Sequence, residues 1–263
     1  KNKKQFQNLN YLNKSFNKIK IFNNLSDEKK FLKNNNINNL LIDDPNINLK
    51  KQKSYGKFIT NLILYQDIPK KNFCNLIINH NYILNAKKKY EQISKKNTKF
   101  LLGLKFYHIE FKKKKKQKNE ITIFLGGYPP IKILINIINK ILSLKIKDMK
   151  LNIFSGYLKL KKFEFMKKKF ENVNFYSLSK RNFFFTKIND SKIFITSGGS
   201  SLIEGIFLNK ICVVLIRAKN QANNCNNFHK KKLIYLLNSK SPENQIKKII
   251  LDNQNKTSNN NLL

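Results

Sequence analysis

The sequence predicts an α/β protein made of two doubly wound, Rossmann-like parallel sheets, and three observations carry this prediction. Short apolar runs recur along the chain and are continuous rather than alternating, which is typical of strands buried on both faces. The segments between these runs are long enough for crossover helices. This alternation restarts behind a run of five lysines at Lys112–Lys116. We therefore expect an α/β domain at 1–110, a lysine-rich linker at 111–120 and a second α/β domain at 121–263.

The first half contains four apolar runs and two helical stretches. Strands are expected at Asn39–Ile42, Phe58–Tyr65, Asn75–Asn79 and Phe100–Leu102, and helices at Asp27–Lys33 and Asn85–Lys96. Ser26 is the expected N-cap of the first helix, because a hydroxyl there can accept a bond from an unpaired backbone N–H. Asp27 and Glu28 then lie in the first turn, where the helix dipole favours negative charge.

The second half repeats the pattern. Strands are expected at Ile121–Leu125, Leu151–Phe154, Val173–Tyr176, Lys192–Thr196 and Ile211–Ile216. Helices are expected at Ile131–Leu144, Phe163–Phe170, Ser201–Leu208, Gln221–Leu237 and Pro242–Leu251. Alternation of strands and helices over such lengths predicts a parallel sheet with helices on its faces.

The net charge is strongly positive, because 53 Lys and Arg against 15 Asp and Glu give +38. Such a balance raises nucleic acid or an anionic membrane surface as a partner. The lysines are spread from end to end, however, and accompany abundant Asn, Ile and Phe, all encoded by AT-rich codons. Arginine, the better reader of bases and phosphates, occurs only at Arg181 and Arg217. We therefore favour an AT-rich genome as the cause of the charge and keep nucleic-acid binding as an alternative.

The cysteines and the apolar runs bound the compartment. Three cysteines in 263 residues exclude a disulfide scaffold and favour a reducing, cytoplasmic location. No apolar run reaches the ~18–20 residues of a membrane span, and no signal peptide opens the chain. The chain begins at Lys1 and both methionines lie far inside it, so a first domain truncated at its start is one interpretation.

Glycine is rare, with only 8 residues, and five of them lie in two clusters: Gly126-Gly127, and Gly198-Gly199 with Gly205. Both doublets follow a predicted strand and precede a predicted helix. Ligands bind at this carboxyl edge in open α/β sheets. Glycine there permits positive φ and lets the backbone approach a ligand, while the helix start offers N–H groups to a phosphate. The two turns therefore predict an anion-binding site.

The second cluster gives the sharper prediction. Ser200 or Ser201 can cap the helix and bond a phosphate oxygen, and Glu204 can accept two bonds from a vicinal diol such as a ribose. The alternative is a tight turn with a serine N-cap and Glu204 as a dipole partner. The amides that follow the next strand favour a sugar–phosphate site. The candidate binding residues are Gly126, Gly127, Ser197, Gly198, Gly199, Ser200, Ser201, Glu204, Asn220 and Gln221.

These residues resemble a known family. The segments S-G-G-S-S-L-I-E-G, N-K-I-C-V-V-L-I and K-N-Q-A-N-N are similar to the C-terminal domain of the UDP-2,4-diacetamido-2,4,6-trideoxy-β-L-altropyranose hydrolases of pseudaminic acid biosynthesis. That family is related to glycosyltransferases of the type B fold. The segments L-L-I-D-D, Y-Q-D-I-P, C-N-L-I-I-N-H-N-Y, L-L-G-L-K-F-Y and I-F-L-G-G resemble further family segments in the same order, so that the likeness covers residues 35–240.

The resemblance implies a UDP-sugar substrate, attack of water on the anomeric carbon and release of UDP, without a metal or another cofactor. The family's catalytic His lies in a G-x-G-H-x-x-R loop that this chain lacks. Its three histidines, His80, His108 and His229, lie elsewhere, and we take His80 to be a surface residue. The catalytic base is therefore unassigned, and we expect hydrolysis near background, with Asp43 and Asp44 as the acidic pair to test.

Two other functions stay open at this stage. A type-B-fold glycosyltransferase would use a sugar hydroxyl as acceptor in place of water. A basic RNA-associated protein would show its lysines gathered on one face, whereas an even scatter counts against it. The oligomeric state and the identity of the sugar are not determined by the sequence.

Overall fold

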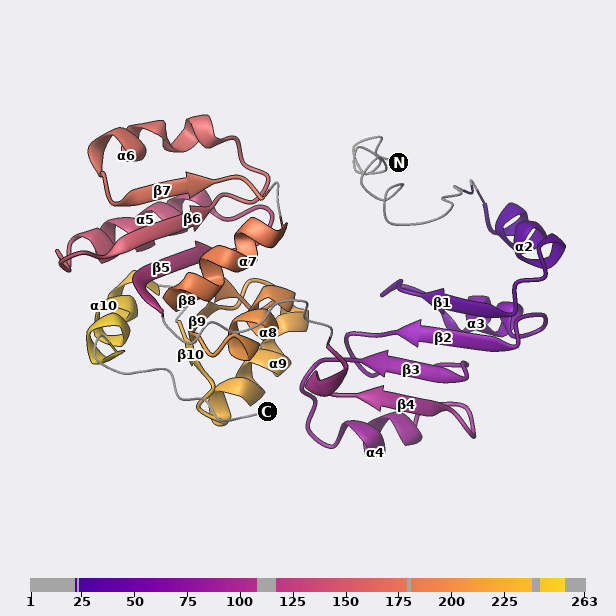
Figure 1. Ribbon diagram of the computed structural model, residues 1–263. Coiled ribbons are helices and arrows are strands. Elements are labelled where there is room, and N and C mark those ends of the chain that lie inside the picture. Colours follow the sequence, from indigo (N-terminus) through magenta and orange to yellow (C-terminus); the bar gives the residue numbers. More distant parts are fainter. Residues whose placement is uncertain (1–21, 23, 108–116, 179–180, 238–241, 254–263) are drawn as a thin grey trace. The chain divides into compact units, whose positions relative to one another are not determined.

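The computed structural model describes residues 22, 24–107, 117–178, 181–237 and 242–253 (Figure 1). Its contacts divide the chain into two compact units. The first holds the described residues up to Gln66, together with Lys70–Ile78 and Glu91–Phe100. The second holds Asp67–Pro69, Asn79–Tyr90 and the described residues from Leu101 onward. Lys112–Lys116 lies outside the described residues, so the linker and the domain bounds stay predictions.

A four-stranded sheet comes first in the chain, with the strand order β1-β2-β3-β4. Its strands are β1 (Asn39–Ile42), β2 (Asn61–Tyr65), β3 (Leu76–Asn79) and β4 (Lys99–Leu102), and the helices around them in sequence are α2 (Leu25–Asn34), α3 (Leu49–Tyr55), α4 (Ala86–Glu91) and the 3-10 turn η2 (Leu104–Phe106). β2 pairs in parallel with both β1 and β3. β2 begins later than predicted, because the N–H groups of Phe58 and Ile59 bond the Tyr55 carbonyl and close α3.

The N-cap of α2 corrects one prediction. Asn24, not Ser26, holds that position, and its side-chain oxygen accepts a bond of 2.9 Å from the N–H of Asp27. Asp27 and Glu28 lie in the first turn, as predicted. The helix therefore starts two residues earlier than predicted, and the Asn24 amide has the capping role that was expected of the Ser26 hydroxyl.

A six-stranded sheet forms the larger unit, with the order β10-β9-β8-β5-β6-β7. The strands are β5 (Lys118–Phe124), β6 (Lys150–Phe154), β7 (Val173–Tyr176), β8 (Ser191–Ser197), β9 (Ile211–Leu215) and β10 (Ile234–Leu236), and all their pairings are parallel. The helices are α5 (Ile131–Leu142), α6 (Glu164–Lys169), α7 (Arg181–Asp190), α8 (Ser200–Phe207), α9 (Lys219–Lys230) and α10 (Pro242–Asn253), with η3 (Leu160–Phe163) before α6.

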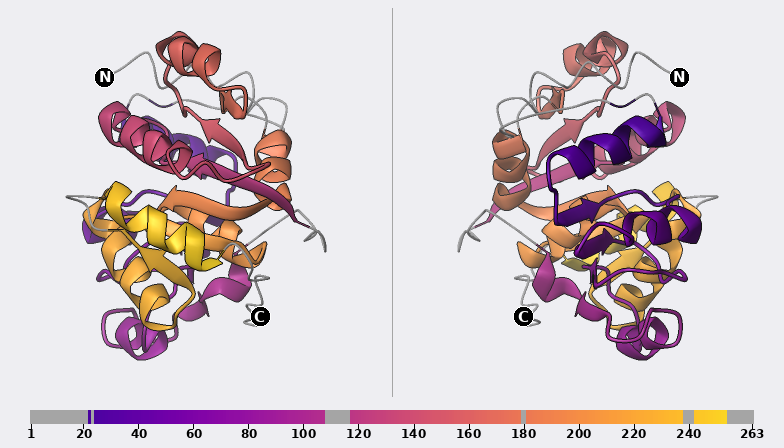
Figure 2. Two further views of the ribbon diagram at one scale, coloured as in Figure 1. Left: turned by 90° about the vertical axis from the view of Figure 1, so that its left-hand side faces the viewer. Right: turned by 90° about the vertical axis from the view of Figure 1, so that its right-hand side faces the viewer.

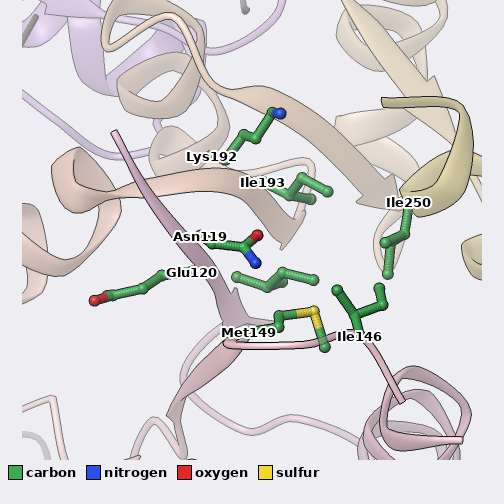
Figure 3. A pocket seen from close by; sticks show the side chains of 8 residues that line it. Asn119, Glu120, Ile146, Met149, Lys192, Ile193 and Ile250 are labelled. Atoms are coloured by element: carbon green, nitrogen blue, oxygen red, sulfur yellow. The ribbon is translucent and has the colours of Figure 1, made fainter. Parts of the chain in front are cut away.

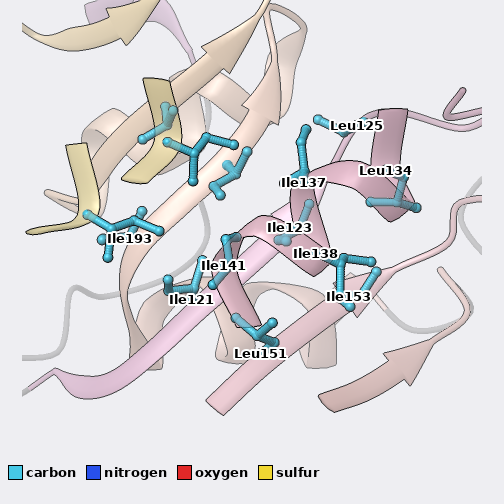
Figure 4. Close-up of a cluster of buried hydrophobic side chains, with 14 of the residues drawn as sticks. Ile121, Ile123, Leu125, Leu134, Ile137, Ile138, Ile141, Leu151, Ile153 and Ile193 are labelled. Carbon is cyan, nitrogen blue, oxygen red and sulfur yellow. The ribbon is translucent and has the colours of Figure 1, made fainter. Parts of the chain in front are cut away.

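Helices cover both faces of this sheet, and the strands divide their side chains between two cores. In β8, Ile193 and Ile195 pack with α5, α6 and α10, whereas Phe194 between them packs with α7, α8 and α9. Figure 4 shows the first of these cores, and in the left view of Figure 2 α5 and α10 lie on one side of the strands and α7 on the other. The sheet is thus doubly wound, and its strands are apolar on both faces for that reason.

The predicted helix Gln221–Leu237 is wrong in its second half. α9 ends at Lys230, Lys232 takes a positive φ of 59°, and Ile234–Leu236 forms β10 beside β9. Three apolar residues fit a strand and a helix equally well, so the turn at Lys232 decided the outcome. Helices α3 and α7 were not predicted at all.

Lys210 is a wholly buried lysine in this otherwise lysine-covered unit. Its Nζ donates a bond of 2.7 Å to the carbonyl of Asn189, in the last turn of α7. An ammonium group there satisfies a carbonyl that the helix leaves unpaired and complements the helix dipole. Of the residues that the structure describes, none forms a helix long and apolar enough to cross a membrane.

Candidate functional site

The larger sheet has a topological switch point between β5 and β8. From β5 the chain proceeds outward through β6 and β7, and from β8 it proceeds the other way through β9 and β10. Ligands of open α/β sheets bind in the crevice at the carboxyl ends of such a strand pair. The two glycine turns predicted from the sequence follow these two strands, so the fold brings them to this edge.

The first turn is a tightly packed piece of backbone. Gly126 has φ +91°, and a Cβ there would lie 3.4 Å from Nη1 of Arg217 and 3.6 Å from Oγ of Ser197. Gly127 lies against the ring of Tyr157. Gly156, with φ +63°, has no room for a Cβ, which would lie 2.2 Å from the Gly127 carbonyl oxygen. The backbone conformation therefore favours glycine at Gly126 in this turn and at Gly156, which follows β6 and packs against the turn.

The second turn differs from its prediction in the roles of the two serines. Gly199 is the N-cap of α8, and no side chain caps the helix. Ser200 is exposed, and the Ser201 hydroxyl is buried within 3.0 Å of the Thr196 hydroxyl. The expectation of a serine cap is therefore wrong. The cap position is at Gly199, which has no side chain, and both serines lie inside the first turn of the helix. An uncapped helix start keeps N–H donors for a ligand.

The amides after β9 lie beside this turn. Gln221 is in the first turn of α9, and its Oε1 accepts a bond of 3.1 Å from the N–H of Arg217. A Cβ on Gly198 would lie 2.9 Å from Cβ of Gln221 and 2.3 Å from Sγ of Cys225. Asn220 is exposed. The structure thus brings Gln221 against the second glycine turn and leaves Asn220 at the surface.

Glu204 is buried, one turn into α8. Its Oε1 accepts a bond of 2.7 Å from the hydroxyl of Tyr107 and lies 3.4 Å from Nη2 of Arg181. Burial raises the pKa of this carboxyl, while the Tyr107 bond and the Arg181 charge oppose that rise. The guanidinium of Arg181 also lies over the Phe185 ring. Glu204 is therefore a buried carboxyl held by Tyr107 and Arg181, which were not among the predicted site residues.

Arg217 is the other site residue that sequence reasoning missed. Its Nη1 donates to the Leu125 carbonyl and its Nη2 donates to the Tyr128 carbonyl at 2.8 Å. One side chain from the end of β9 thus bridges the turn after β5. A signal existed, because arginine occurs only twice in this lysine-rich chain and both copies lie at this edge of the sheet.

The two histidines that the structure describes, His80 and His229, have contacts outside the two glycine turns. His80 is 8% exposed and its ring packs edge-on against Tyr107 at 4.9 Å, so the surface interpretation of His80 is wrong. His229 interacts through Nδ1 with the Ile234 carbonyl at 3.1 Å. His108 lies outside the described residues. No group of three or more metal-ligating side chains occurs in the part of the chain that the structure describes.

A small pocket lies at the opposite edge of the sheet, at the amino ends of β5, β6 and β8 (Figure 3). Its polar neighbours are Asn119, Glu120 and Lys192, on an apolar lining that includes Met149 and Ile250. Glu120 accepts a bond from Asn152 at 2.7 Å, and burial lowers the pKa of Lys192. Figure 3 shows the polar ends of Glu120 and Lys192 pointing apart. The pocket lacks convergent polar groups, and we place the candidate site at the switch point instead.

Comparison with known proteins gives the fold class. No protein-family model and no curated protein matches the chain. MurG of Acinetobacter baumannii is similar in structure, with a TM-score of 0.56 at 11% identity over 86% of this chain and 68% of that protein. The spinosyn rhamnosyltransferase SpnG has a TM-score of 0.57 at 11% identity, and the match covers 89% of this chain and 69% of SpnG. The glycotransferase of kitacinnamycin has a TM-score of 0.51 at 12% identity, and the match covers 69% of this chain. This chain spans 46% of the length of that protein.

The chain has the fold of type B glycosyltransferases, with two Rossmann-like parallel sheets. At sequence identities of 11–12%, these similarities are evidence for a shared fold and not for a shared activity. The fold-class prediction is confirmed.

Proposed function

We propose that this chain binds a nucleoside-diphosphate sugar at the switch point and cleaves the C–O bond between the sugar and the diphosphate. The observation that carries the proposal is the uncapped start of α8 between the turn at Gly126 and the buried Glu204. A helix N-terminus offers N–H donors and a positive dipole end to a phosphate. The same groups would stabilise the diphosphate as it leaves with the bonding electrons, which is the electrostatic contribution to catalysis.

The acceptor of the sugar defines two versions of this function. Transfer to a hydroxyl is our main proposal, supported by the likeness in fold to MurG and to the spinosyn rhamnosyltransferase, which has also been solved with thymidine diphosphate. Transfer to water, as in the UDP-sugar hydrolases of pseudaminic acid biosynthesis, is supported by the ordered sequence segments that resemble that family. Either reaction fits a cytoplasmic protein, since Cys74, Cys212 and Cys225 are free thiols.

The positive charge of the chain gives little support to RNA binding as its function. Exposed lysines occur on α5 and α10, on one face of the larger sheet, and on α9, on the other, as at Lys132, Lys247 and Lys230. A scatter over both faces favours compositional bias over a single nucleic-acid surface.

Calorimetry with UDP tests the binding step. We expect heat of binding with the full chain at low salt. Glu204→Gln should weaken the binding of UDP by about 1–3 kcal/mol, the contribution of hydrogen bonds to a charged group. Glu164→Gln is the matched control, because it removes an exposed carboxylate from the first turn of another helix. Absence of heat at millimolar UDP would overturn the proposal.

The acceptor is tested by isotope. Turnover of a UDP-sugar in ¹⁸O-water places the label in the free sugar if water is the acceptor, whereas a transferase releases UDP only when a hydroxyl acceptor is added. The base is unassigned, so we expect release of UDP in water alone to stay near background, without the ~10²–10⁴-fold of positioned acid–base catalysis. Label in the sugar at ordinary enzyme rates would favour the hydrolase version.

A further inference from the structure

We infer that Arg217 is a diphosphate-binding residue: its guanidinium braces the turn at Gly126 and pairs with the terminal phosphate of the nucleotide. The inference deepens the proposed function and rests on it. It assigns a specific cation to the anionic end of the ligand, a role that neither glycine turn can supply.

The composition of the chain makes the arginine informative. Lys and Arg together number 53, and arginine occurs only at Arg181 and Arg217. Lysine serves at nearly every basic position, so positions that keep arginine are those where a guanidinium does something an ammonium does not. A guanidinium is planar and can bond two acceptors at once in a fixed geometry.

Arg217 uses that geometry. Its Nη1 and Nη2 bond the carbonyls of Leu125 and Tyr128, which flank the Gly126-Gly127 turn, and its own N–H is fixed by Gln221. The residue is nevertheless exposed. A guanidinium has five N–H donors, and these two bonds use two of them. The side chain is therefore held in place by backbone carbonyls and keeps donors for an incoming anion.

The place of Arg217 fits the terminal phosphate rather than the nucleoside. A Cβ on Gly126 would lie 3.4 Å from Nη1 of Arg217 and 3.6 Å from Oγ of Ser197, so the guanidinium is beside the start of the second turn. Glu204 has different neighbours, Tyr107 and Arg181. A nucleotide with its ribose at Glu204 and its phosphates along the start of α8 would run toward Gln221 and Arg217.

The experiment measures dissociation constants of UDP, UMP and uridine for the wild type, Arg217→Gln, Arg217→Lys and Lys219→Gln. Lys219 is an exposed lysine two residues along, and its removal controls for the loss of one positive charge from a chain of +38. We expect Arg217→Gln to weaken the binding of UDP by about 10- to 100-fold and that of UMP by much less. The difference in affinity between UDP and UMP should therefore become smaller. Arg217→Lys should recover only part of the loss, because an ammonium cannot form the fork. Lys219→Gln should bind UDP like the wild type.

The outcomes separate this inference from the function on which it rests. If the wild type binds no UDP, both fail. If the wild type binds UDP and Arg217→Gln binds it equally well, Arg217 is not a ligand of the diphosphate. If Arg217→Gln weakens UDP, UMP and uridine by the same factor, the side chain only braces the turn, and the inference is also overturned. Arg217→Lys keeps the charge and allows the same comparison if Arg217→Gln fails to fold.

Discussion

The two glycine turns of the switch point use glycine for different reasons. In the first turn glycine is required by backbone conformation at Gly126, which has positive φ. This turn packs against Gly156, a glycine with positive φ that follows β6 and lies against the backbone of Gly127. In the second turn no glycine has positive φ, and Gly198 is required because Cys225 and Gln221 fill the space beside it. Gly199, the next residue, has nothing closer to its Cβ position than the Gln221 side chain at 3.9 Å. Adjacent glycines in one motif can thus differ completely in what they tolerate.

The largest expected effect is at Gly156. Gly156→Ala should destabilise the fold by about 2–5 kcal/mol, the sum of the left-handed conformation and of overpacking against the Gly127 carbonyl. Urea denaturation measures it. Gly156→Asn is the discriminating variant, because asparagine tolerates positive φ but carries the same Cβ. If asparagine restores most of the stability, conformation alone explains the glycine and the backbone contact does not.

Gly198→Ala should cost about 1–3 kcal/mol, since its Cβ would overlap Sγ of Cys225. The cost should shrink in a Cys225→Ala background, which removes the sulfur. A double-mutant cycle in denaturation free energy measures the coupling. Additivity of the two changes to within about 0.5 kcal/mol would show that the sulfur is not what excludes the methyl group.

The two turns should also respond differently to pH, because only the second leads into a helix with a buried carboxyl. Burial raises the pKa of Glu204 above its ordinary value of 4.5, so the folded state holds this proton more tightly than the unfolded state does. The contribution of Glu204 to stability is therefore fully present below pH 4.5 and is lost as pH rises through the folded pKa. Glu204→Gln should gain stability relative to the wild type over that rise.

Denaturation at a series of pH values measures the difference. Tyr107→Phe, which removes a bond that lowers the pKa of Glu204, should extend the trend to higher pH. A difference between Glu204→Gln and the wild type that stays flat with pH would contradict the prediction.

The smallest effect is expected at Gly199. Gly199→Ser should leave stability unchanged or raise it by a few tenths of a kcal/mol, because the position is the N-cap of α8 and has room for a side chain. Thermal unfolding measures it beside Gly198→Ala. A loss comparable to that of Gly198→Ala would remove the contrast between the neighbouring glycines.

The larger sheet was largely predictable because its central strands are buried on both faces. β1 and β7 have the predicted bounds, and β9 differs by one residue, since continuous apolar runs end sharply at turns. The alternation of strands and helices in each half could be predicted from the length of the segments between the apolar runs. β10 was missed because three apolar residues after α9 also satisfy a helical pattern, and α3 because its sequence, LKKQKSY, has few apolar positions.

The site was predictable at its backbone and less so at its side chains. Rare glycines at strand ends identified the two turns, which the fold brings to one edge. The roles of Ser200 and Ser201 depended on where α8 begins, and a shift of one residue moved the N-cap to Gly199. Tyr107, Arg181 and Arg217 act through contacts with residues 23 to 97 positions away, which no local pattern reports.

The buried amine of Lys210 has a consequence for chemical labelling. Reagents that acylate amines will modify the many exposed lysines of the native protein at once, whereas the Nζ of Lys210 is inside the larger unit and bonded to Asn189. Its modification requires that α7 and the start of β9 come apart. The rate at which the peptide containing Lys210 acquires the label therefore reports how often this part of the sheet opens, against a background of surface amines that serve as the internal standard for reagent activity.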